Sequence, residues 1–224
     1  MSSKKTCFFI SGFGPKPDLN KPGRTIDLDK TFENLIKPVF DELNIDCFRA
    51  KDIRHTGIID VPMYEWIFKA DIVIADVSTL NPNALYELGV RHALRPNTTI
   101  VISEDQTNYP FDINHTVITK YEHLGKDIGV SEAKRFKSEL KSTVLFIFKN
   151  IKKDSPVYTY LPKLIPPKFS DEELEIITSK PENDVSLSEL IQSAEQAKNN
   201  NEFYAAIELY KICLKFAPKN VFLI

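Results

Sequence analysis

The chain has 224 residues, a formal net charge of −2 and 42 % hydrophobic residues. This apolar content is high enough to form a buried core, so the sequence is not that of a disordered protein. The near-neutral charge argues against non-specific binding to nucleic acid or to anionic membranes, because neutralising phosphates requires an excess of basic residues. No apolar run approaches the roughly 20 residues of a membrane span.

The cysteines indicate a reducing compartment. Cys7, Cys47 and Cys213 are far apart in the sequence, and their spacing fits neither a metal site nor a disulfide framework. The histidines show no metal spacing either. The apolar stretch from Cys7 to Ile10 is too short for a signal peptide. We therefore expect a cytoplasmic protein that needs no metal or other cofactor.

Short apolar runs alternate with amphipathic segments over residues 1–150. Asp27 is expected to cap the first helix, and Pro38 to kink or break it. Asn81 followed by Pro82 is a typical helix start. The runs predict strands at 6–11, 45–49, 71–77, 98–103 and 116–119, and the helical spacing of apolar residues predicts helices at about 28–43, 60–69, 83–94 and 131–150.

Strands that are apolar throughout and alternate with helices are typical of a parallel sheet covered on both faces. We expect an α/β fold with a doubly wound, flavodoxin- or Rossmann-like sheet of strand order about 2-1-3-4-5. In such a sheet ligands bind at the carboxyl ends of the strands, where the strand order reverses. The loop Ser11–Gly14 and the loop Asp76–Asn83 should therefore flank one crevice.

The composition changes after residue 150. Five of the fourteen prolines fall between residues 152 and 183, among many apolar residues. We expect residues 151–184 to be a Pro-rich linker that packs on the first domain rather than a free spacer.

Residues 185–224 have the pattern of a tetratricopeptide repeat. Its aromatic, alanine, aromatic, small and proline positions are Phe203, Ala206, Tyr210, Cys213 and Pro218. One such repeat cannot bury its apolar face alone, so we expect an α-helical hairpin that begins a longer array. The alternative is a natural C-terminus whose last residues dock on the first domain.

The densest group of polar residues lies between residues 70 and 94. Asp76 and Ser78 follow the third strand, Asn81 and Asn83 begin the next helix, and Glu87 lies one turn into it. The helix start offers free backbone N–H groups and the positive end of the helix dipole, which favour a phosphate or another anion. A carboxylate one turn deeper could attack or stabilise an oxocarbenium-like carbon, as in glycoside hydrolysis.

Further ligand-binding residues are expected around the same crevice. Arg49, at the end of the second strand, could neutralise a phosphate or a carboxylate. The remaining candidates for ligand contact are Ser11, Gly12, Phe13, Gly14 and Tyr86.

Each candidate also has a structural alternative. The glycines could simply turn the chain out of the first strand, and the two asparagines could cap the helix. Asp76 could cap a turn, and Tyr86 could serve packing. Glu87 and Arg91 could form an i,i+4 surface ion pair.

The run Asp71–Asp76, followed by Asn81–Asn83, Tyr86–Gly89 and Ala93, resembles nucleoside 2-deoxyribosyltransferases and related deoxyribonucleotide N-glycosidases. More distantly it is similar to the TIR-like superfamily, whose NAD-cleaving members use a glutamate on the corresponding helix. The resemblance implies that Glu87 is the nucleophile at C1′ and that Asp76 contacts the sugar or the base.

A second resemblance concerns the architecture. The stretch from Phe68 to Val101, followed by tetratricopeptide repeats, is similar to the N-terminal regulatory region of apoptosis-signal-regulating kinases and their bacterial relatives. The element Leu88–Arg91 is shared. The animal kinases lack a glutamate at the position of Glu87, so their version looks non-catalytic, whereas this chain keeps the glutamate.

We therefore expect residues 1–150 to cleave, or transfer across, the N-glycosidic bond of a nucleoside, a nucleotide or an NAD-like molecule. The alternative is a non-catalytic nucleotide-sensing or scaffold module in stress or defence signalling. In both cases the repeat would bind a protein partner or a further domain, with no membrane or direct nucleic-acid contact, and homo-oligomerisation is compatible with either.

Overall fold

The computed structural model describes residues 4–18, 21–52, 60–170 and 187–200, together with residues 203, 206, 207, 209 and 210. The chain divides into two compact units, Met1–Ser170 and Asp171–Ile224. The first unit extends past residue 150, where the sequence suggested a boundary.

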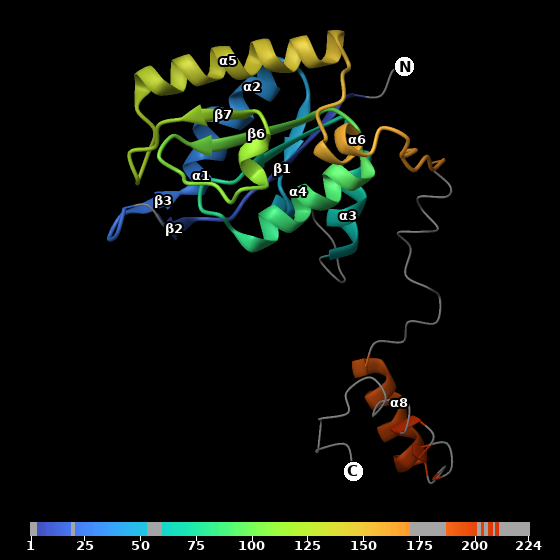
Figure 1. Ribbon diagram of the computed structural model, residues 1–224. Coiled ribbons are helices and arrows are strands. Elements are labelled where there is room, and N and C mark those ends of the chain that lie inside the picture. The colour runs from blue at the N-terminus through green and yellow to red at the C-terminus, as the bar shows by residue number, and fades with distance from the viewer. Residues whose placement is uncertain are drawn as a thin grey trace. The chain divides into compact units, whose positions relative to one another are not determined.

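A five-stranded parallel sheet forms the centre of the first unit (Figure 1). Numbered along the chain, these five strands have the order 2-1-3-4-5, which confirms the predicted doubly wound α/β fold. Every residue of the third and fourth of these strands is buried, as expected for a sheet covered on both faces. In spatial order the strands are β4 (Asp46–Phe48), β1 (Thr6–Ile10), β5 (Ile72–Asp76), β6 (Thr99–Glu104) and β7 (Ile118–Tyr121).

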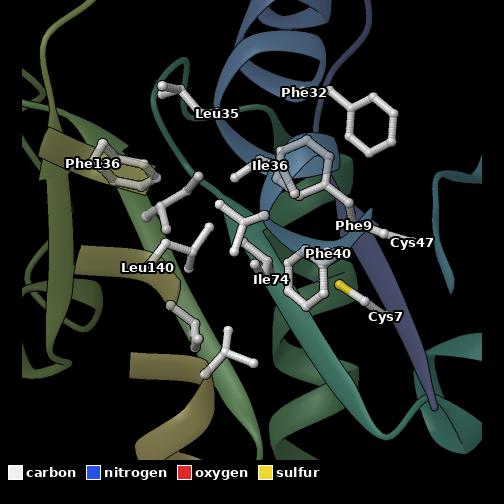
Figure 2. Close-up of a cluster of buried hydrophobic side chains, with 14 of the residues drawn as sticks. Cys7, Phe9, Phe32, Leu35, Ile36, Phe40, Cys47, Ile74, Phe136 and Leu140 are labelled. Carbon is white, nitrogen blue, oxygen red and sulfur yellow. The ribbon is translucent and has the colours of Figure 1, made fainter. Parts of the chain in front are cut away.

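Helices cover the two faces of this sheet. On one face, Phe9 and Ile74 belong to a core that also contains residues of the first helical segment and of α5 (Val130–Lys149) (Figure 2). On the other face, a second core joins the strands to α3 (Asp60–Lys69) and α4 (Pro82–Leu94). Figure 1 shows α2 and α5 on one side of the sheet and α3 and α4 on the other.

The predicted helix at 28–43 is observed in three parts, which are α1 (Leu28–Thr31), the π-helical η1 (Phe32–Ile36) and α2 (Lys37–Glu42). Asp27 caps the segment as predicted, because its side chain accepts a hydrogen bond from the Asp29 amide. Pro38 has no N–H to donate, and its ring clashes with a carbonyl four residues earlier. The helix widens before it, and the Lys37 amide donates to the Phe32 carbonyl. The predicted kink is therefore a π-helical turn.

Short elements complete the first unit. The strands β2 (Pro15–Pro17) and β3 (Thr25–Asp27) form an antiparallel pair that the sequence did not predict. Strands of three residues with prolines carry no recognisable alternation, which explains the omission. The remaining elements are the 3-10 turns η2 (Ala50–Asp52) and η3 (Ile113–His115) and the helix α6 (Pro156–Tyr160).

The described part of the expected linker contacts the first unit. The Ser155 hydroxyl donates to the His92 carbonyl at 2.7 Å, and the Tyr158 hydroxyl donates to the Ala93 carbonyl at 2.8 Å. These bonds attach α6 to the last turn of α4. Residues 171–184 of the expected linker lie outside the described residues.

The second unit contains α8 (Leu187–Asn199), at the place expected for the first helix of the repeat. Ala194, Ala197 and Ala206 are buried. Cys213 and Pro218 lie outside the described residues, so the repeat hairpin stays a prediction. Within the described parts of the chain, no helix is long and apolar enough to cross a membrane.

Arg91 is the largest fully buried side chain of the described residues, and it joins α4 to its neighbours. Its guanidinium donates to the carbonyls of Ile67 at 2.8 Å and Ala70 at 3.2 Å, around the end of α3. It also donates to the Thr98 hydroxyl at 2.9 Å, directly before β6. Burial lowers the pKa of Arg91 to about 9, so the side chain is still charged at neutral pH.

Replacing Arg91 by methionine keeps much of its volume but removes every donor. We expect Arg91→Met to lower the free energy of unfolding by about 3 kcal/mol, because buried carbonyls lose their partners. Urea unfolding measures the change. Arg135→Met removes a half-exposed, ion-paired arginine of α5 and should cost less than about 1 kcal/mol. Equal losses in the two variants would contradict the role given to Arg91.

Candidate functional site

Two loops meet at the carboxyl edge of the sheet, where the strand order reverses between β1 and β5. The first loop follows β1 and contains Gly12, and the second follows β5 and reaches Asn81. A Cβ built on Gly12 would lie 3.2 Å from Nδ2 of Asn81 and 2.9 Å from Cδ1 of Leu28. The missing side chain at Gly12 therefore allows the two loops to touch, as the strand order predicts.

The loop after β1 bonds to its own backbone and to the start of α1. The Ser11 hydroxyl donates to the Gly12 carbonyl at 2.8 Å. Gly14 has a φ of +62°, a conformation that favours glycine, and its carbonyl accepts from the Leu28 amide. The ring of Phe13 is 39 % exposed, with the Lys51 ammonium 5.4 Å from its centroid. Phe13 is thus the side chain of this loop that presents a flat apolar surface.

Asn81 is the N-cap of α4. Its Oδ1 accepts from the Asn83 amide at 2.9 Å and from the Ala84 amide at 3.4 Å, while the Leu85 amide donates to the Asn81 carbonyl. Pro82 has no N–H. The expectation of free backbone N–H groups at this helix start is therefore wrong, because the cap already occupies them.

Two other predicted contact residues lie on the first turns of α4. Asn83 is exposed, and Tyr86 is 62 % exposed, so neither side chain belongs to the buried core. Neither side chain forms a hydrogen bond with a described residue. Both are therefore free to contact a ligand at this end of α4.

Glu87 lies one turn into α4 and is half-buried. Residues four apart share a helix face, and Arg91 reaches the carbonyls at the end of α3. The i,i+4 ion pair is absent, because the Arg91 guanidinium is bonded to these carbonyls instead. Glu87 has no ionic or hydrogen-bonded partner among the described residues, and partial burial raises its pKa to about 7.

Asp76 faces the opposite side of the sheet. Because strand residues alternate, it shares a face with Ile72 and Ile74, which belong to the core beneath α5. Its carboxylate accepts from the Ser78 amide at 2.9 Å, from the Ser78 hydroxyl and from the Tyr121 hydroxyl at 2.7 Å. Burial raises the pKa of Asp76, and these three donors oppose that rise. No described contact joins Asp76 to Glu87.

Asp76 belongs to a buried polar cluster, which we call the Asp76 network. Its members are Thr31, Asp76, Ser78, Glu104 and Tyr121. The Tyr121 hydroxyl also bonds Ser78 at 2.9 Å and Thr31 at 3.1 Å, and the Glu104 amide donates to the Ser78 hydroxyl at 2.8 Å. Ser78 is 2 % exposed. These contacts link three strands and α1, and they give Asp76 and Ser78 hydrogen-bond partners inside the protein.

The network could not be found from the sequence. Its members come from four separate elements, and only the tertiary fold brings Tyr121 and Glu104 next to Ser78. The one available signal was that Tyr121 and Glu104 each end a strand at the carboxyl edge.

Arg49 is likewise engaged. It is 6 % exposed, forms ion pairs with Asp29 at 2.6 Å and Asp52 at 3.3 Å, and lies 4.0 Å from the ring centroid of Phe32. Two carboxylates therefore neutralise its charge. Its role in binding a phosphate stays a prediction.

Lys16 is a cation at this edge that the sequence did not single out. It belongs to β2, and its Cε lies 3.7 Å from a Cβ built on Gly12. It has no ionic partner among the described residues. Its position depends on the β2–β3 hairpin, which explains why the sequence gave no reason to select it.

The position of Glu87 suits chemistry by a single carboxylate. Over the described parts of the chain, no group of three or more His, Cys, Asp or Glu side chains could hold a metal ion.

No family model matches the chain, and no curated protein matches it.

The Asp76 network gives a stability prediction. Tyr121→Phe removes one donor from the buried Asp76 carboxylate, so we expect the free energy of unfolding to fall by about 1–3 kcal/mol. Tyr86→Phe removes a hydroxyl that bonds no described residue and should leave it unchanged. Urea unfolding compares the two variants. An unchanged free energy of unfolding in Tyr121→Phe would contradict the network.

Proposed function

We propose that the first unit cleaves, or transfers across, the N-glycosidic bond of a nucleoside, a nucleotide or an NAD-like molecule. One observation carries the proposal. The Glu87 carboxylate is partly buried near the start of α4, is not paired with Arg91 and has a pKa of about 7. A perturbed carboxylate that forms no ion pair with the described residues is a candidate for chemistry, because none of these residues neutralises its charge.

The reaction uses Glu87 in its ionised form. The carboxylate oxygen bonds to C1′ while the C1′–N bond breaks, and the departing base takes that electron pair and then a proton. This gives a glycosyl ester of Glu87. Water, or the nitrogen of a second base, then attacks C1′, loses its proton and releases the carboxylate. The two acceptors correspond to hydrolysis and to base transfer.

Residues at the carboxyl edge would hold the substrate. The exposed Asn83 and Tyr86 are available for the sugar or the base, and the Phe13 ring offers a stacking surface. A substrate phosphate would be attracted to Lys16 rather than to the paired Arg49 or the occupied amides of α4. The sequence did not suggest Lys16 as the residue that recognises the phosphate.

The second candidate function is nucleotide sensing without turnover. It is favoured by the engagement of Asp76 and Arg49 with partners inside the protein, which leaves Glu87 without a second catalytic charge. In either case we propose that the C-terminal unit is a repeat that binds a protein partner or a further domain, and that the protein acts in the cytoplasm.

The experiment is to incubate the 224-residue chain with NAD, NADP, nucleosides and nucleoside 5′-monophosphates, and to quantify released base by chromatography. We expect base release from at least one substrate, and a loss of at least about a hundredfold in Glu87→Gln. Glu139→Gln, which changes an exposed glutamate of α5, is the matched control and should retain full activity.

The pH dependence tests the ionised form of Glu87. Since the carboxylate is the reactive form, kcat/KM should rise about tenfold per pH unit below pH 6 and level off above about pH 8. Activity that falls through this range would assign Glu87 to proton donation instead.

Two results would contradict the proposal at different points, the first for the activity and the second for the role of Glu87 alone. Binding of a substrate without base release would leave the sensing function. Equal turnover by the wild type and Glu87→Gln would remove Glu87 from the chemistry.

A further inference from the structure

A cavity of about 350 Å³ lies at the amino edge of the sheet, at the other end of the strands from Asp76 and the loop after β1. The first half of β6 and the start of β7 line one side of it. The last turns of α5 and the segment from Lys152 to α6 line the other. Figure 1 shows the chain passing from the end of α5 to α6 beside the starts of β6 and β7.

The cavity has an apolar interior and an aromatic rim. Ile100 and Val101 of β6 line it and are almost fully buried. Phe146 of α5 and Tyr160 of α6 also line it, yet they are 57 % and 71 % exposed. Large aromatic side chains left in solvent beside a concave apolar surface are typical of a ligand-binding site.

Three polar side chains around the cavity bond to their own helices. The hydroxyls of Thr143 and Thr159 donate to the carbonyls of Glu139 and Ser155, each four residues earlier. The Asn150 amide donates to the Phe146 carbonyl. These side chains complete their own helices and therefore do not require a ligand.

The charges at the cavity leave a positive excess. Lys152 and Lys153 are exposed, line the cavity and form no ion pair with any described residue. The carboxylate that lines the cavity is that of Asp154, which accepts from the Thr99 amide at 2.9 Å. The positive charge of Arg91 nearby offsets the charge of Asp154. Among the described residues, the two lysine ammonium groups thus remain without a counter-charge.

His92 adds a neutral polar group inside the cavity. It is 8 % exposed, and its ring forms no hydrogen bond with a described residue. Burial, together with repulsion from Arg91, lowers the pKa of His92 to about 4, so the ring is uncharged at neutral pH. A neutral imidazole offers one donor and one acceptor to a bound molecule.

We propose that this cavity binds a small organic anion that carries a carboxylate on an apolar or aromatic body. Lys152 and Lys153 hold the carboxylate, and Ile100, Val101, Phe146 and Tyr160 contact the body. The site lies at the opposite edge of the sheet from the proposed glycosidase site and does not depend on that function.

A pair of probes of similar shape tests the proposal by isothermal titration calorimetry. The first is 1-naphthoate, and the second is the uncharged 1-naphthylmethanol. We expect 1-naphthoate to bind saturably at one site per chain and at least tenfold more tightly than the alcohol. The double variant Lys152→Gln, Lys153→Gln should weaken 1-naphthoate binding at least tenfold and leave alcohol binding unchanged.

Two further variants separate the cavity from the general surface. Lys134→Gln, Lys137→Gln makes the same change of net charge on the first half of α5, outside the cavity lining, and should not alter the affinity. Thr143→Trp fills the cavity from α5 and should abolish binding of both probes. The proposal is overturned by absent or non-saturable binding, by equal affinity for the two probes, or by unchanged 1-naphthoate binding in either cavity variant.

Discussion

The buried guanidinium of Arg91 is the interaction on which the candidate site depends. Its hydrogen bonds to Ile67, Ala70 and Thr98 fix α4 against α3 and β6. The same bonds turn the guanidinium away from Glu87, one turn earlier on the helix. Because the Arg91 guanidinium joins elements of the fold, it does not form the expected ion pair with Glu87. Partial burial then raises the pKa of the Glu87 carboxylate to about 7.

The sheet places the two candidate carboxylates on opposite faces. Asp76 points into the core beneath α5 and is bonded to Ser78 and Tyr121, whereas Glu87 lies on α4, on the other side. Glycosidases that use two carboxylates hold both at the same bond. The proposed reaction instead rests on Glu87 alone, with a nucleobase as a leaving group that accepts the electron pair of the broken bond.

Local signals in the sequence predicted the fold well. The apolar strands gave the parallel sheet and its order, and Asp27 and Asn81 cap the helices they were expected to cap. The site was harder to predict, because its details depend on contacts between distant elements. The partners of Arg49, the place of Lys16 and the occupation of the α4 amides by Asn81 exist only in the folded chain.

The state of the Glu87 carboxylate is the most direct test of this account. The measurement is a pH titration followed by NMR, with ¹³C at the side-chain carboxyl carbon of glutamate and the Glu87 signal assigned by its loss in Glu87→Gln. We expect that signal to titrate with a midpoint of about 7, well above an ordinary glutamate. A midpoint near 4.3, the ordinary value, would show a solvated or ion-paired side chain and would contradict the account.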